Sequence, residues 1–184
     1  MQENASSVLT AWASFFVITG SSGASLTGLM FVVITIIADR GTQARDEGIA
    51  AFSTPTVVHF CGALLVSAIL SAPWRSLVPA GFLLALAGAL ALVYVCRVLV
   101  RARRLSTYRP DIEDWTWYTI LPCVTYAAIT AGGVLLTAVP GAGMFALAGA
   151  SLLLIFIGIH NAWDTVTYIA IDNVEDASEP VEPS

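Results

Sequence analysis

The chain of 184 residues is 57% hydrophobic and only 11% charged, with a mean hydropathy of +0.80, whereas about a quarter of the residues of a soluble domain are charged. Its eight basic and 13 acidic residues are bunched and leave uncharged runs at 4–38, 48–74, 76–96 and 115–163, each long enough to cross a bilayer. The composition excludes a soluble enzyme and a disulfide-rich secreted domain. A net charge of −5, with arginine as its only basic residue type besides histidine, excludes a nucleic-acid-binding protein.

The uncharged runs predict helices, because backbone groups in hydrocarbon must be hydrogen-bonded within their own segment. The run 115–163 is too long for one crossing, and Val-Pro-Gly-Ala-Gly at 139–143 is a turn signal. We therefore predict an all-α fold, an integral membrane bundle in one domain over 1–171, followed by a disordered acidic tail at 172–184. The five predicted helices span about 11–38, 49–72, 77–100, 115–138 and 144–171.

The arginines predict the direction of the crossings, because basic residues in short loops resist translocation. Only Arg75 falls on one side of the predicted membrane. The arginines on the other side are Arg40, Arg45, Arg97, Arg101, Arg103, Arg104 and Arg109. This bias predicts a multi-pass protein of the inner (plasma) membrane, with the N-terminus outside and the C-terminus in the cytoplasm. Arg97, Arg101 and Arg104 share one helical face, where they anchor the helix or bind anionic lipid headgroups or an acidic partner.

Both histidines lie in predicted spans, His59 in the second and His160 in the fifth. Each lies about 15 Å from the cytoplasmic end of its helix at about 1.5 Å per residue, so the two rings can face each other at one depth. Asp164 follows His160 by four positions and shares its helical face. A carboxylate inside a span usually faces a partner or water. The other polar side chains that could join this centre are Asn161, Thr56 and Thr167.

This polar centre has three interpretations. Its side chains can hydrogen-bond across helices and hold the bundle together. They can form a proton or cation path in which histidine and aspartate exchange protons. The imidazoles of His59 and His160 can also hold a metal or a haem iron, with Gly62 and Gly158 leaving room for the porphyrin.

The first predicted helix carries a series of small residues, Gly20, Ala24 and Gly28, at a spacing that lets another helix approach closely. We expect an interface here, within the chain in preference to between copies in a homo-oligomer. Pro55, one turn before His59, removes a backbone hydrogen bond and allows a bend in the second helix.

The stretch at 21–33, SSGASLTGLMFVV, resembles the first helix of small bacterial polytopic membrane proteins that open with a Gly-Ala-x-Leu-Thr-Gly-Leu-x-Phe-Val pattern. The resemblance implies a polytopic bacterial membrane protein and no particular activity.

Functional motifs are absent from the sequence: there is no G-x-S-x-G, H-E-x-x-H, P-loop or dinucleotide fingerprint, and its three cysteines form no C-x-x-C pair. We therefore do not expect an enzyme. The preferred function is a small channel-like or transporter-like protein without a cofactor, which passes or senses protons or cations through His59, His160 and Asp164. The alternatives are a haem b electron-transfer protein with two histidine ligands, and a non-conducting adaptor or sensor that recruits partners through its arginines and acidic tail.

Overall fold

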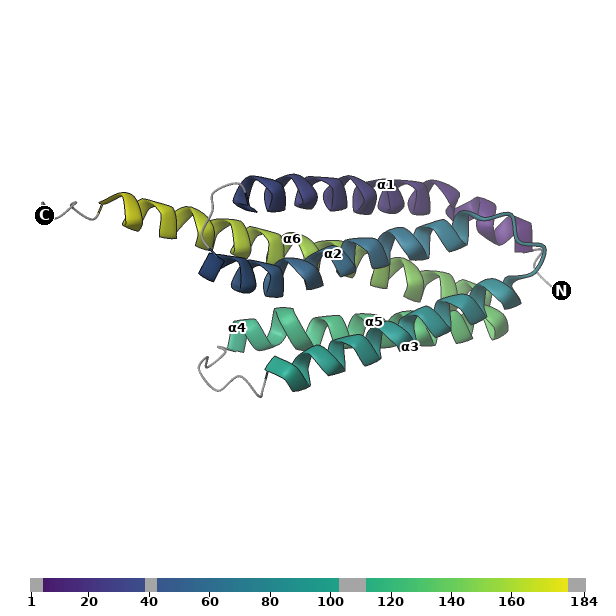
Figure 1. Cartoon of the computed structure of the whole chain (residues 1–184). Helices are drawn as coiled ribbons and strands as arrows, with labels where there is room; N and C mark the ends of the chain where they lie inside the picture. The colour runs from purple at the N-terminus through teal and green to yellow at the C-terminus, as the bar shows by residue number, and fades with distance from the viewer. Residues whose placement is uncertain (1–4, 39–42, 103–111, 179–184) are drawn as a thin grey trace, which may run out of the picture.

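The computed structural model describes residues 5–38, 43–102 and 112–178, and the side chains of 5–36, 54–100, 113 and 115–167. The described part of the chain is all-helical and contains no strand, as the sequence predicts. Its elements are α1 (Ala5–Ala38), α2 (Gln43–Ser71), α3 (Leu77–Ala102), a short α4 (Ile112–Trp115), the π-helical segment η1 (Thr116–Ile120), α5 (Leu121–Ala138) and α6 (Pro140–Ser178) (Figure 1).

The long helices lie side by side in the order α1, α2, α6, α5, α3, so that α6 packs on both α2 and α5 (Figure 1). Helix α1 also touches α6, whereas α3 packs mainly on α5. Helices α1, α3 and α6 end, and α2 and α4 begin, at one end of the bundle. We call this the arginine-rich end, because seven of the eight arginines lie in the segments that join the helices there or near the helix ends that flank those segments.

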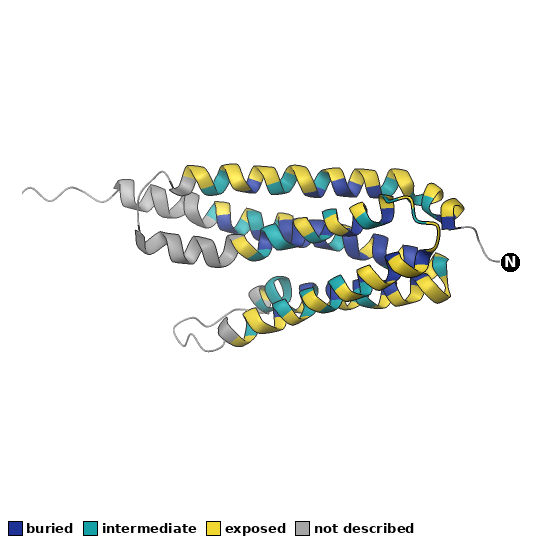
Figure 2. Cartoon of the chain, turned by 45° about the vertical axis from the view of Figure 1, so that its right-hand side comes forward, coloured by how far each residue is buried: buried dark blue, intermediate teal, exposed yellow. Residues whose placement is uncertain are grey.

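Within the described ranges, five helices are long and apolar enough to cross a membrane, which is the predicted number. The apolar stretches are Ala5–Ile36, Thr54–Ser71, Leu77–Val100, Thr116–Ala138 and Pro140–Thr167. Large apolar side chains such as Phe82, Phe145 and Trp163 are exposed, and Figure 2 shows that exposed residues run along the outer faces of the helices. An apolar outer surface of this extent suits contact with lipid.

The break between α5 and α6 is shorter than the predicted five-residue turn. Only Val139 leaves the helical conformation, and α6 begins at Pro140. Proline fits the first turn of a helix because the amide proton it lacks has no partner there. Gly143 makes the sharp reversal possible, because a Cβ on it would lie 2.5 Å from the Leu136 backbone nitrogen.

The terminal bounds of the helices also differ from the predicted ones. Helix α2 begins at Gln43, six residues before the predicted start, and α6 continues to Ser178, into the segment predicted to be disordered. Extending an existing helix adds one hydrogen bond for each residue fixed, and the first proline after the apolar region is Pro180. Helix α6 therefore includes 172–178 of the predicted tail, and 179–184 lie outside the described residues.

Helices α3 and α5 approach most closely where glycines face each other. A Cβ on Gly133 would lie 2.5 Å from the Ala85 nitrogen, and one on Gly81 would lie 2.5 Å from the Gly133 carbonyl oxygen. A Cβ on Gly88 would meet the Thr130 backbone at 2.7 Å. Without a hydrophobic drive between helices in lipid, close backbone packing of this kind holds a helix pair together.

Candidate functional site

His59 is buried between α2 and α5 and is hydrogen-bonded to a tyrosine. Its ring is 2% exposed, and its Nδ1 atom lies 2.9 Å from the Tyr126 hydroxyl oxygen. Tyr126 is also 2% exposed. The pair joins α2 to α5 in the interior of the bundle and satisfies one ring nitrogen of the histidine. We call it the His59–Tyr126 pair.

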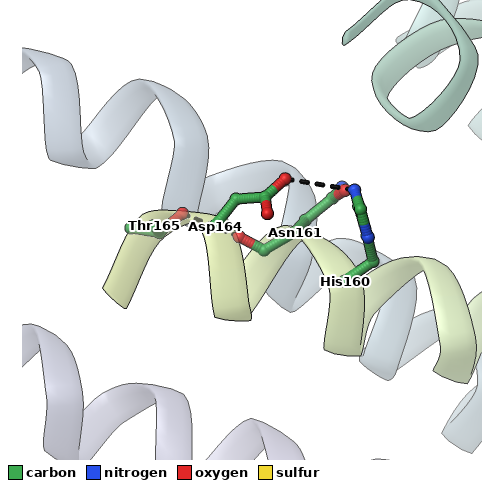
Figure 3. A network of polar contacts seen from close by, with 4 residues as sticks. All are labelled: His160, Asn161, Asp164 and Thr165. Carbon is green, nitrogen blue, oxygen red and sulfur yellow. Dashed lines mark hydrogen bonds and ion pairs between the residues drawn. The ribbon is translucent and has the colours of Figure 1, made fainter. Parts of the chain in front are cut away.

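His160 forms a second pair, with Asp164 one turn further along α6. The His160 Nε2 and Asp164 Oδ2 atoms lie 3.1 Å apart (Figure 3), an ion-pair distance that lacks the alignment of a hydrogen bond. The His160 side chain is 23% exposed and that of Asp164 is 44% exposed. The predicted sharing of one helical face is thus confirmed for these two residues, which we call the His160–Asp164 pair.

Trp117 covers the ring of His160. The two ring centroids are 3.8 Å apart and the planes differ by 17°, which is a stacked arrangement. Trp117 belongs to η1, where the Leu121 amide donates to the Thr116 carbonyl across five residues. Pro122 follows directly and cannot donate a backbone hydrogen bond, which explains a local change of helical pitch at this point. Such π-helical turns are frequent at functional sites.

Asn161 lies on the inner side of α6 and is fully buried. Its backbone carbonyl accepts a hydrogen bond of 2.8 Å from the Thr165 hydroxyl (Figure 3). Neither its side-chain Nδ2 nor its Oδ1 atom has a hydrogen-bond partner among the described residues. A buried amide without hydrogen-bond partners lowers the stability of the fold by about 1–3 kcal/mol. Asn161 is therefore a candidate for binding a further polar group.

Packing contacts fix the register of α2 against α6. The Phe60 ring occupies the position that a Cβ on Gly158 would take, and Leu154 lies 3.0 Å from the Cβ position of Gly62. Because the two helices are antiparallel, these contacts place Thr56 level with Asn161. Thr56 is fully buried as well.

The same register puts the two histidines at similar heights, but they have different neighbours. Within the described part of the chain, His59 is hydrogen-bonded to Tyr126 and His160 is stacked on Trp117. Thr167, the outermost of the predicted site residues, is half-buried near the arginine-rich end. The structure therefore joins each histidine to an aromatic residue of the α5 region, and neither aromatic partner was predicted.

A porphyrin between the two histidines does not fit this packing. The space beside Gly62 is filled by Leu154 and Tyr126, and the space beside Gly158 is filled by Phe60. The predicted room at these two glycines is therefore wrong. Among the described residues, no three His, Cys, Asp or Glu side chains lie close enough to hold a metal ion together.

The small residues of α1 form an interface only in part. A Cβ on Gly20 would lie 2.8 Å from the Ser67 Cβ atom, so Gly20 faces α2. Ala24 and Gly28 are exposed, and no atom lies within 4 Å of a Cβ on Gly28. The predicted contact within the chain is therefore wrong for these two residues. Gly23, which was not predicted, takes their place, since a Cβ on it would lie 2.8 Å from the Phe60 carbonyl oxygen.

The remaining predicted residues lie towards the arginine-rich end. Pro55 is inside α2, and Arg97 is exposed near the end of α3. Arg101 is in α3, but its side chain lies outside the described residues, and so does the whole of Arg104.

The comparisons with known proteins give no relative: no family model, curated protein or solved structure matches this chain.

Proposed function

We propose that this chain is a channel-like or transporter-like membrane protein that passes or senses protons or cations. The observation that carries the proposal is the His160–Asp164 pair, with its atoms 3.1 Å apart on an apolar helix long enough to span a membrane. An ionisable side chain inside a span is expensive to insert and usually marks a path for ions or protons. Histidine is the side chain best suited to taking up and releasing a proton near neutral pH.

The partial exposure of the His160–Asp164 pair supports access of protons or cations to this site. The His59–Tyr126 pair is buried in the interior of the bundle, whereas His160 and Asp164 are partly exposed near the arginine-rich end. We propose that this end faces the cytoplasm and that the protein resides in the inner (plasma) membrane, as the distribution of arginines favours. Ions would then reach Asp164 first and His160 next from the cytoplasmic side.

A flux assay tests this function. The full chain is reconstituted into liposomes, and the decay of imposed pH, Na⁺ and K⁺ gradients is compared for wild type, Asp164→Asn and His160→Ala. We expect faster decay of one gradient with wild type than with empty liposomes, and slower decay with both variants. Ser22→Ala is the matched control, because the Ser22 hydroxyl is bonded to the Ile18 carbonyl of its own helix, away from the site. Intact gradients with the wild-type protein would overturn the proposal and favour an adaptor.

A further inference from the structure

We propose that the side chain of Asn161 binds ordered water between α2 and α6, and that this water carries protons between the His160–Asp164 pair and the His59–Tyr126 pair. The inference rests on the proposed function and narrows it, since the transported species is then the proton.

The unpartnered amide is the first reason to place water here. Asn161 is fully buried, and its Nδ2 and Oδ1 atoms lack hydrogen-bond partners in the described part of the chain. The Nε2 atom of the neighbouring His160 lacks an aligned hydrogen bond as well. Buried polar groups in proteins nearly always bond to protein or to ordered water, and a buried water typically joins about three such groups. The amide oxygen, the amide nitrogen and the ring nitrogen supply acceptors and donors of this kind.

The position of Asn161 is the second reason. It lies three residues after Gly158, whose Cβ position is occupied by Phe60 of α2, so this stripe of α6 faces α2. Thr56 is level with Asn161, and His59 follows Thr56 by one turn on the same side of α2. Water at the amide would therefore lie between the helix that carries His59 and the helix that carries His160.

The imidazoles on either side of this place suit the transfer of a proton. A proton needs one acceptor at a time. An imidazole can accept a proton at one ring nitrogen and release another from the other, so each step forms one bond to hydrogen, breaks one, and leaves the ring neutral.

Two substitutions of Asn161 separate water binding from packing. Asn161→Leu keeps a similar volume but removes both polar atoms, and Asn161→Ser keeps a polar group and leaves room for a further water. We expect Leu to slow proton flux by about tenfold or more, the factor for losing one hydrogen-bonded link, while Ser retains most of the flux. Thr165→Val is the matched control, because it removes a neighbouring buried hydroxyl that already has a partner in the Asn161 backbone carbonyl.

Infrared difference spectra recorded on acidification in H₂¹⁶O and H₂¹⁸O detect the water itself. We expect an isotope-sensitive O–H band in wild type and in Asn161→Ser that is lost in Asn161→Leu. Absence of this band from the wild-type protein, or unchanged proton flux in a folded Asn161→Leu protein, would overturn the inference and leave the proposed function standing. Flux of Na⁺ or K⁺ without flux of protons would also overturn the inference and leave the proposed function standing. Wild-type liposomes that pass none of the three ions would instead overturn the proposed function.

Discussion

The hydrogen bond between His59 and Tyr126 joins two buried groups, so each depends on the other. We predict that Tyr126→Phe lowers the free energy of unfolding by about 1 kcal/mol, because the His59 Nδ1 atom loses its buried partner. A double-mutant cycle with His59→Ala, measured by unfolding in mixed micelles, should give a coupling energy of about 0.6 kcal/mol, the average for hydrogen bonds between membrane helices.

Thr137→Val serves as the control for this cycle, because the Thr137 hydroxyl lies on the same helix as Tyr126 but donates to the Val134 carbonyl of its own helix. It should show no coupling with His59→Ala. A coupling of zero for Tyr126 as well would contradict the role given to its hydroxyl.

The stacking of Trp117 on His160 makes the indole an optical reporter of the site. A protonated imidazole in contact with an excited indole quenches its emission, so acidification should reduce the fluorescence of the wild-type protein in liposomes. The effect should be smaller in His160→Ala and in Trp117→Phe, because each removes one ring of the stack. Equal quenching in all three proteins would show that other tryptophans account for the signal.

The sequence predicted contacts along one helix better than contacts between helices. Asp164 could be placed beside His160 because residues four apart share a face of any α-helix. Tyr126 and Trp117 could not be assigned to the histidines in this way, because an aromatic residue in an apolar helix gives no sign of which neighbour it faces. That depends on the rotation and register of α5, which the π-helical turn at η1 changes further.

At the scale of helix pairs, glycine positions determine which surfaces meet. Helix contacts alternate steps of three and four residues, which average one turn of 3.6 residues, whereas a series that always steps by four drifts around the helix. Gly20, Gly23 and Thr27 of α1 follow the first pattern and lie at or near α2. The predicted series with Ala24 and Gly28 follows the second pattern and turns away from it.

The α3–α5 contact permits a direct test with two identical substitutions. Gly133→Ala should lower the free energy of unfolding by about 1–3 kcal/mol, because the added methyl group would lie 2.5 Å from the Ala85 nitrogen and force the helices apart. Gly149→Ala on α6 should be neutral or stabilising by up to about 1 kcal/mol, because its Cβ would meet no atom within 4 Å and alanine favours the helix.

Thermal unfolding in detergent measures both substitutions. Equal effects at the two positions would be inconsistent with close backbone packing between α3 and α5.

For the whole molecule, hydropathy was sufficient to predict the all-helical class and the number of apolar helices. Hydropathy could not predict the lateral order of the helices. All five have apolar faces exposed on the bundle, and contact with lipid is about equally favourable for each of them. The order follows from local shape, such as the glycines of α3 and α5 and the fit of Phe60 against Gly158.

The orientation of the bundle can be tested by cysteine labelling. In a protein whose three native cysteines are replaced, Cys introduced at Ser76 should react with an impermeant maleimide added to intact cells, whereas Cys at Ser106 should not, because the proposed topology keeps the arginine-rich segments in the cytoplasm. Labelling only after the cells are opened would confirm that the Ser106 site is accessible. The reverse pattern would invert the proposed topology.

The central position of α6 has a consequence for biogenesis. During synthesis, α1 and α2 emerge first and can associate as a hairpin, and α3 and α5 can do so next, but α6 packs between the two units and is translated after both. It also supplies His160, Asn161 and Asp164. The polar site is therefore incomplete until α6 joins the helices made before it, so we expect the proposed ion path to be absent from a nascent chain that still lacks this helix.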